Sequence, residues 1–171
     1  AVLAKLDEAT AKTDDPEVKR ALKKMRECTE RSNKLLTLSG LRTLPSEIGQ
    51  LTNLTGLTLH DNQLTTLPPE IGQLTKLTYL GLKRNQLTTF PPEIAKLEKL
   101  KHLDLGQNQL TTIPPEIGKL TTLTQLTFSG NDLSTVPPEI GQLTNLTHLR
   151  LWDNQLSTIP PEIGQLTKLT N

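Results

Sequence analysis

Leucines recur along most of the chain at a spacing that fits neither a helix nor a long strand. In the block 51–73 they stand at offsets 1, 4, 7, 9 and 14, followed by an apolar residue at offset 17 and isoleucine at offset 21. Between offsets 6 and 10 the pattern alternates, which is typical of one short strand with Leu57 and Leu59 turned inward. Because one short strand cannot bury its own leucines, the block needs neighbours of the same kind.

The block repeats with a period of 23 residues. Full repeats occupy 51–73, 74–96, 97–119, 120–142 and 143–165, with a degenerate repeat at 34–50 and a partial repeat at 166–171. Stacked units of this size predict a solenoid whose strands pair into one parallel sheet, about 4.8 Å apart. We expect these strands near Leu57–Leu59, Leu80–Leu82, Leu103–Leu105, Leu126–Phe128 and Leu149–Leu151.

Two other parts of the repeat are constant in every full block. Offset 12 is always asparagine, namely Asn62, Asn85, Asn108, Asn131 and Asn154. Since an amide both donates and accepts hydrogen bonds, we predict that this column is a structural ladder for backbone groups where the chain leaves the sheet, not a ligand site. Offsets 18 to 20 read Pro-Pro-Glu, which predicts an extended segment leading into one tight helical turn on the convex side.

The consensus LxxLxxLxLxxNxLxxLPPEIGx resembles the leucine-rich repeat, in the variety found in intracellular Ras-group scaffolds, Scribble-like proteins and Roco GTPases. The resemblance covers 51–171 and, more loosely, 34–50. It implies an α/β solenoid, shaped as a horseshoe with the parallel sheet on its concave face. It also implies that the domain binds other proteins, although the partners differ between members of such families.

Residues 1–33 have a different composition and predict a helical N-terminal cap. Asp15, Pro16 and Glu17 form a typical helix start, and apolar residues then recur at helical spacing opposite a basic face. An earlier short helix is predicted around Leu6. We interpret the two helices as a cover over the open end of the first coil, as terminal units of a solenoid require. The alternative is that the basic helix binds a partner.

The repeat beside this cap is irregular. Leu36, Leu41 and Leu44 fit the unit with Ser39 at the asparagine position, whereas Lys34 either replaces an inward leucine or marks a register slip of one residue. The last repeats show no such irregularity. We therefore expect an uncovered edge there, and a natural chain that continues with more repeats or another domain.

Composition and charge exclude several classes of partner. The net charge of +1, from 19 basic and 18 acidic residues, gives no general attraction to nucleic acid or to an anionic membrane, and we expect neither. A single cysteine, Cys28, excludes an intramolecular disulfide framework and favours a reducing, cytoplasmic location. The sequence contains no recognisable signal peptide or membrane span.

The informative positions are the outward strand offsets 6, 8 and 10, which form the concave face. All three histidines, the one tryptophan and the one tyrosine fall at these offsets. Because tyrosine, tryptophan and arginine are common anchors of protein interfaces, we predict partner contacts at Tyr79, His102, Asp104, His148, Arg150 and Trp152. Of these, His148, Arg150 and Trp152 alternate along one strand and should project together. The alternative is that large side chains merely fill the face or, at Trp152, pack on further repeats.

The same positions argue against catalysis, metal binding or a cofactor. His102 and His148 lie two coils apart, about 10 Å at sheet spacing, which is too far for shared zinc ligation. No activated nucleophile stands beside His102 and Asp104, and no phosphate-binding loop is present. The glutamates at offset 20 repeat identically, as scaffold residues do.

Two functional hypotheses remain. The first is a cytoplasmic signalling or scaffolding module that binds a protein or peptide on its concave face. The second is an N-terminal regulatory domain of a larger signalling enzyme, such as a Roco-type GTPase, with the chemistry beyond residue 171. The sequence indicates neither the oligomeric state nor the partner.

Overall fold

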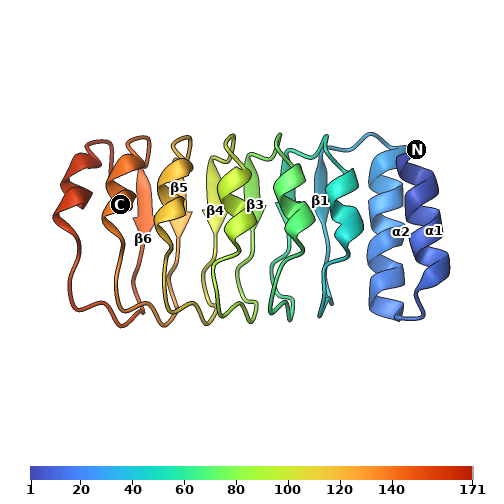
Figure 1. Ribbon diagram of the computed structural model, residues 1–171, viewed down its shortest axis with the longest axis horizontal. Helices are drawn as coiled ribbons and strands as arrows, with labels where there is room; N and C mark the ends of the chain where they lie inside the picture. Colours follow the sequence, from blue (N-terminus) through green and yellow to red (C-terminus); the bar gives the residue numbers. More distant parts are fainter. Residues whose placement is uncertain (171) are drawn as a thin grey trace.

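The computed structural model describes residues 1–170 as two helices followed by a stack of similar coils (Figure 1). The helices are α1 (Val2–Lys12) and α2 (Pro16–Glu30). The strands are β1 (Leu35–Thr37), β2 (Gly56–Thr58), β3 (Tyr79–Gly81), β4 (His102–Asp104), β5 (Gln125–Thr127) and β6 (His148–Arg150). They form one six-stranded parallel sheet in sequence order. This arrangement confirms the predicted α/β solenoid, and β2 to β6 each begin one residue before the predicted position.

A short 3-10 helix lies on the side of each coil opposite its strand (Figure 1). These turns are η1 (Ser46–Gln50), η2 (Pro69–Gln73), η3 (Pro92–Lys96), η4 (Pro115–Lys119), η5 (Pro138–Gln142) and η6 (Pro161–Gln165). In η2 the first proline of the pair, Pro68, is extended with φ −67° and ψ 144°, and the second begins the turn. The prediction of an extended proline segment and one tight turn is therefore confirmed.

The core is a narrow column of leucines between the sheet and the turns. Leu57, Leu80, Leu103 and Leu126 are adjacent in the sheet register, and all four are buried. The last of these inward strand leucines, Leu149, is only partly buried because no following strand covers it among the described residues. A narrow column needs only a few apolar residues from each coil. A chain with 34% hydrophobic residues can therefore form this core.

The two helices cover the first coil. Asp15 caps α2 by accepting hydrogen bonds from the backbone N–H groups of Glu17 and Val18, as the sequence predicts. Helix α1 packs against η1 and α2 packs against β1. Leu6 and Leu22 belong to the same buried cluster as the leucines of the coils. The helices thus bury the apolar side of the first coil, as a terminal cap must.

The first coil corrects the register predicted for it. Leu36 pairs with Leu57, 21 residues later, so it occupies offset 7 and Leu35 faces outward. Leu41 takes the place of Leu64, 23 residues later, since each donates its backbone N–H to the ladder asparagine of the next coil. The coil is therefore two residues shorter between these points. The predicted slip of one residue was wrong, and Lys34 does not replace an inward leucine.

The two residues that the first coil lacks, relative to the other coils, include the one at the asparagine position. Ser39 is exposed and makes no ladder bond, so its placement at that position was wrong. Gly40 instead turns the chain with φ 71°, a conformation that favours glycine, where the next coil uses Asp61 at φ 56°. Asn62 still joins the first coil to the second, because its amide donates to the carbonyl of Leu38 just as Asn85 donates to that of Leu59.

Candidate functional site: the concave face

The concave face consists of two rows of outward side chains across the strands, with the offset 10 residues beyond them. The sheet register fixes the first row as Leu35, Gly56, Tyr79, His102, Gln125 and His148, and the second as Thr37, Thr58, Gly81, Asp104, Thr127 and Arg150. Five of the six predicted contact residues therefore lie in these rows. Trp152 follows β6 at offset 10.

Tyr79 forms an aromatic group with two histidines. Its ring packs edge-on against His60 and His102, with ring centroids 6.4 Å and 6.3 Å away respectively. The Tyr79 hydroxyl lies 2.8 Å from His60 Nε2. Because His60 Nδ1 accepts the backbone N–H of Lys83 at 3.1 Å, the imidazole proton sits on Nε2 and is donated to the tyrosine oxygen. The hydrogen of the Tyr79 hydroxyl is therefore free for another acceptor.

Gly81 makes the room that this pair requires. A Cβ at this position would collide with the His60 ring and would lie 2.8 Å from Tyr79 Oη. A residue with any side chain would therefore displace the hydrogen-bonded pair. The glycine of β3 is thus part of the aromatic group, although it contributes no side chain.

The electrostatic surroundings keep Tyr79 neutral. Burial raises the pKa of the Tyr79 phenol above its ordinary value of about 10, and the negative charge of Asp104 raises it further. Asp104 is itself oriented by a hydrogen bond, since its Oδ1 accepts the backbone N–H of Gly106 at 2.9 Å. At neutral pH the phenol therefore presents a hydroxyl donor beside a carboxylate.

A second group of outward side chains lies on β6 and on the residues just after it. The hydroxyl of Thr147 donates to the carbonyl of Thr124, so at 2.9 Å it accepts from His148 Nδ1, and Nε2 is the imidazole nitrogen that faces away from this bond. Arg150 is exposed and forms no ion pair within the described chain. Trp152 is 65% exposed. The imidazole of His148, the cation of Arg150 and the ring of Trp152 therefore project from one strand and its continuation.

The structure brings the six predicted residues together as two groups, not as one cluster. Tyr79, His102 and Asp104 lie on β3 and β4, and the β6 group is separated from them by β5, which presents Gln125 and Thr127. Sequence reasoning placed His60 on this face without counting it among the predicted contacts, and it missed Leu35. Leu35 is 72% exposed, and only the corrected register of the first coil reveals that it points outward.

The asparagine column is fully occupied by backbone bonds. Asn85 Oδ1 accepts the N–H of Leu64 at 3.0 Å, and Nδ2 donates to the carbonyls of Leu59 at 2.8 Å and Leu82 at 3.0 Å. Each amide thus joins its own coil to the preceding one. Asn154 makes the equivalent bonds but is only half-buried. The amide groups bind the backbone and leave no free edge for a ligand.

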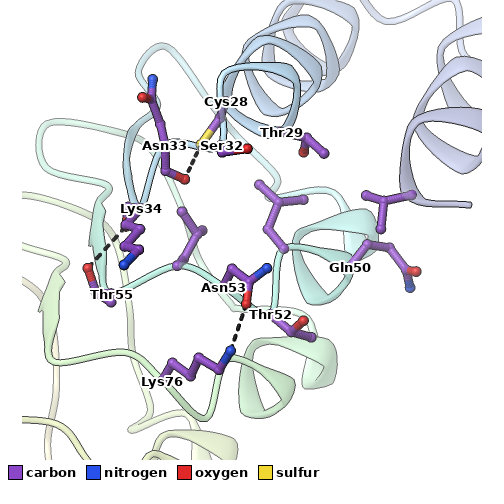
Figure 2. Close-up of a pocket in the computed structure, with 13 residues that line it drawn as sticks. Cys28, Thr29, Ser32, Asn33, Lys34, Gln50, Thr52, Asn53, Thr55 and Lys76 are labelled. Carbon is purple, nitrogen blue, oxygen red and sulfur yellow. Dashed lines mark hydrogen bonds between the residues drawn. The ribbon is translucent and has the colours of Figure 1, made fainter.

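One pocket of about 430 Å³ lies where the end of α2 meets the first coil (Figure 2). Leu51 and Leu54 line it together with Cys28. At its edge Lys76 Nζ donates to Asn53 Oδ1 at 2.7 Å. Burial raises the pKa of the Cys28 thiol, which keeps it protonated and poorly nucleophilic. The pocket therefore offers no activated catalytic group.

Within residues 1–170, no group of three or more histidine, cysteine, aspartate or glutamate side chains is placed to hold a metal ion. No helix in the same range is long and apolar enough to cross a membrane.

Comparison with known families and structures agrees with the fold. A family profile described as "Leucine-rich repeat region" matches residues 70–171, and one described as "Leucine Rich Repeat" matches residues 53–74. Comparison with curated proteins gives no significant match.

Several solved structures superpose well on the chain. A leucine-rich repeat protein of Leptospira interrogans is 42% identical with a TM-score of 0.79, covering 90% of this chain and 38% of its own. The internalin inlF of Listeria monocytogenes is 29% identical with a TM-score of 0.68, covering 75% and 37% respectively. The ectodomain of the Arabidopsis receptor kinase HAESA, solved with an IDA peptide hormone ligand, is 32% identical with a TM-score of 0.71, covering 80% and 24%. The chain therefore spans well under half the length of these proteins.

Proposed function

The chain belongs to the leucine-rich repeat family, and on that premise we propose that it binds a protein or peptide partner through its concave face. Repeats of this fold generally mediate interactions between proteins, and the family is typically not enzymatic. The contact residues that we propose are Tyr79, His102, Asp104, His148, Arg150 and Trp152, together with His60 and Leu35.

The observation that carries this proposal is the exposure of anchor-type side chains on a face whose residues change from coil to coil. Trp152 is 65% exposed and Leu35 is 72% exposed, while the guanidinium of Arg150 has no ion pair among the described residues. Folding does not require large side chains at these positions, because glycine and threonine occupy the same rows in other coils. Aromatic and arginine side chains of this kind carry much of the energy at protein interfaces.

One solved neighbour supports a peptide as one kind of partner. The HAESA ectodomain, which superposes on 80% of this chain, was solved with a peptide hormone ligand. That ligand belongs to that receptor, and the present chain spans only 24% of it. The likeness supports an interaction surface on the repeats and does not identify the partner.

We further propose that the chain works as an intracellular signalling or scaffolding module without catalysis of its own. The free thiol of Cys28 and a cap held by helices, not by disulfides, suit a reducing compartment. Fractionation of the source cells with an antibody against the chain tests this location. Recovery in an extracellular fraction would contradict it.

Co-precipitation with matched variants tests the binding proposal. The concave variant carries Arg150→Ala and Trp152→Ala, and the convex control carries Lys119→Ala and Gln165→Ala, two exposed residues of η4 and η6. We expect the unaltered chain and the convex control to retain the same partner from source-cell extract, and the concave variant to lose it. Retention by all three chains, with equal melting temperatures, would overturn the proposal.

A further inference from the structure

Two charged residues of the concave face, Asp104 and Arg150, occupy strand positions with a defined separation. Asp104, Thr127 and Arg150 are adjacent in the register of β4, β5 and β6. Two strand spacings of about 4.8 Å place Asp104 and Arg150 about 10 Å apart along the row. The residue between them is the uncharged Thr127, and Asp104 and Arg150 form no ion pair with each other in the described chain.

Both charged groups are open to a partner. Arg150 is exposed and has no ion pair within the described chain. Asp104 uses Oδ1 for the N–H of Gly106, and no hydrogen bond or ion pair in the described chain uses its other oxygen. Lys83, at offset 10 of the preceding coil, is the remaining lysine or arginine at these offsets and forms no ion pair with Asp104 in the described part of the chain.

The spacing distinguishes between possible backbone conformations of a bound segment. In a polyproline II helix, side chains about three residues apart lie on the same face and about 9 Å apart. In a β-strand, side chains on one face are separated by about 7 or 13 Å. Of these two extended conformations, polyproline II comes closest to the separation of the strand positions of Asp104 and Arg150.

The neighbouring side chains suit the same conformation. Polyproline II segments dock in grooves lined by aromatic residues, and their backbone carbonyls carry no internal hydrogen bonds. Tyr79 lies on β3, beside the strand that carries Asp104, and Trp152 lies two residues beyond Arg150 in the chain. The Tyr79 hydroxyl retains a free hydrogen because His60 donates to its oxygen, so it can donate to such a carbonyl.

We propose that the concave face binds a polyproline II segment of a partner protein that carries one basic and one acidic side chain about three residues apart. The basic group lies against Asp104 and the acidic group against Arg150. This inference rests on the proposed function of the concave face and adds the chemistry and the spacing of its ligand. The two charges fix the register of the segment, while the aromatic groups contact its ring and aliphatic side chains.

Synthetic proline-rich peptides test this proposal with the purified chain by fluorescence anisotropy. Each peptide carries one lysine and one glutamate, and the series varies only the number of residues between them. We expect the peptide with a separation of about three residues to bind about two- to fivefold more tightly than peptides of the same composition with other separations, which can form only one of the two ion pairs.

Variants of Asp104 make the test specific. Asp104→Asn keeps an acceptor for the Gly106 N–H and should remove the preference for lysine. Asp104→Lys should reverse it, so that a peptide with two glutamates binds best. The matched control is Glu116→Lys, which makes the same charge change at an exposed position of η4 and should leave all affinities unchanged.

The outcomes separate this inference from the function on which it rests. Peptide binding that is lost in the Arg150→Ala, Trp152→Ala variant but shows no dependence on charge spacing would overturn the inference and leave the proposed function intact. A preference for a separation of about seven residues, the repeat of two helical turns, would also overturn it in favour of a bound α-helix. Peptide binding that persists unchanged in the concave variant would contradict both.

Discussion

The concave and convex faces belong to the same coils, yet they differ in how far their residues recur. The convex motif is repeated from coil to coil, whereas the outward residues of the concave face change. On the convex side Pro-Pro-Glu recurs in every full repeat, and the isoleucines of η1 to η5 are buried. On the concave side the first outward row changes from glycine to tyrosine, histidine and glutamine. The turns pack closely against the next coil, so their residues are restricted by folding. The outward strand residues meet few such restrictions and are free to serve binding.

The same contrast exists between adjacent residues of one strand. In β5, Leu126 is buried and Gln125 is exposed. Because side chains alternate between the two sides of a strand, stability and recognition can be altered separately by changing neighbouring residues. Gly81 is an exception on the concave face, since the pair formed by His60 and Tyr79 occupies the space of its missing side chain.

The largest effect expected is the loss of an inward leucine from a central coil. Leu126→Ala removes a fully buried side chain and should lower the free energy of unfolding by about 2–5 kcal/mol, through lost burial and the cavity left behind. Gln125→Ala on the same strand should change it by less than about 0.5 kcal/mol. Urea unfolding of both variants measures this difference. Equal losses would refute the separation of the two sides.

The asparagine column should show the next largest effect. Asn108→Leu leaves the N–H of Leu87 without its acceptor and removes one of the two amide donors to the carbonyl of Leu82, and it should cost about 1–3 kcal/mol of stability. Asn154→Leu should cost less because this residue is half-buried and water can replace its bonds. Melting temperatures test the order. Equal losses at the two positions would mean that burial does not determine how much each asparagine amide contributes to stability.

Trp152 and Leu151, which follow the last described strand, allow the outward and inward sides to be compared at neighbouring residues. Trp152→Ala should weaken partner binding by about 1–2 kcal/mol and leave the melting temperature almost unchanged. Leu151→Ala should do the reverse, because Leu151 packs on the core, although its effect should lie toward the lower end of about 2–5 kcal/mol since it is only partly buried. A loss of stability at Trp152 without a change in binding would assign that ring to packing.

The smallest effect concerns the ionisation of Tyr79. Because this is the one tyrosine of the chain, absorbance of the phenolate reports its pKa directly, and the midpoint should lie above that of a free tyrosine. A pKa raised by folding means that the stability it contributes is complete below about pH 10 and is lost as the pH rises through the folded value.

Asp104→Asn separates the two causes of that shift. Removing the carboxylate should lower the Tyr79 midpoint only in part, because burial is the larger cause and remains. A midpoint equal to that of free tyrosine in the variant would show instead that the charge of Asp104 dominates.

The periodic part of this molecule could be predicted from sequence because each repeated residue has one structural reason to recur. The spacing of the leucines defined the strands, and the prolines defined the turns. The first coil could not be placed, because a deletion of two residues removed the asparagine that would have shown its register. Leu35 was missed for that reason.

Contacts between coils explain why His60, although placed on the concave face, was not counted among the predicted contacts. His60 and Tyr79 are 19 residues apart, and their hydrogen bond depends on the room left by a glycine. The division of the predicted residues into two groups also required the sheet register, since the sequence shows which side chains face outward and not what lies between them.

Affinity measured on matched triple variants tests the central claim most directly. A peptide selected from a random library on the unaltered chain is titrated against a concave variant, in which His148, Arg150 and Trp152 are alanine, and against a convex variant, in which Lys119, Gln142 and Gln165 are alanine. If the concave face carries recognition, the first should lose at least about tenfold in affinity while the second keeps it, and both should melt at the temperature of the unaltered chain. Loss of affinity in the convex variant alone would contradict the account.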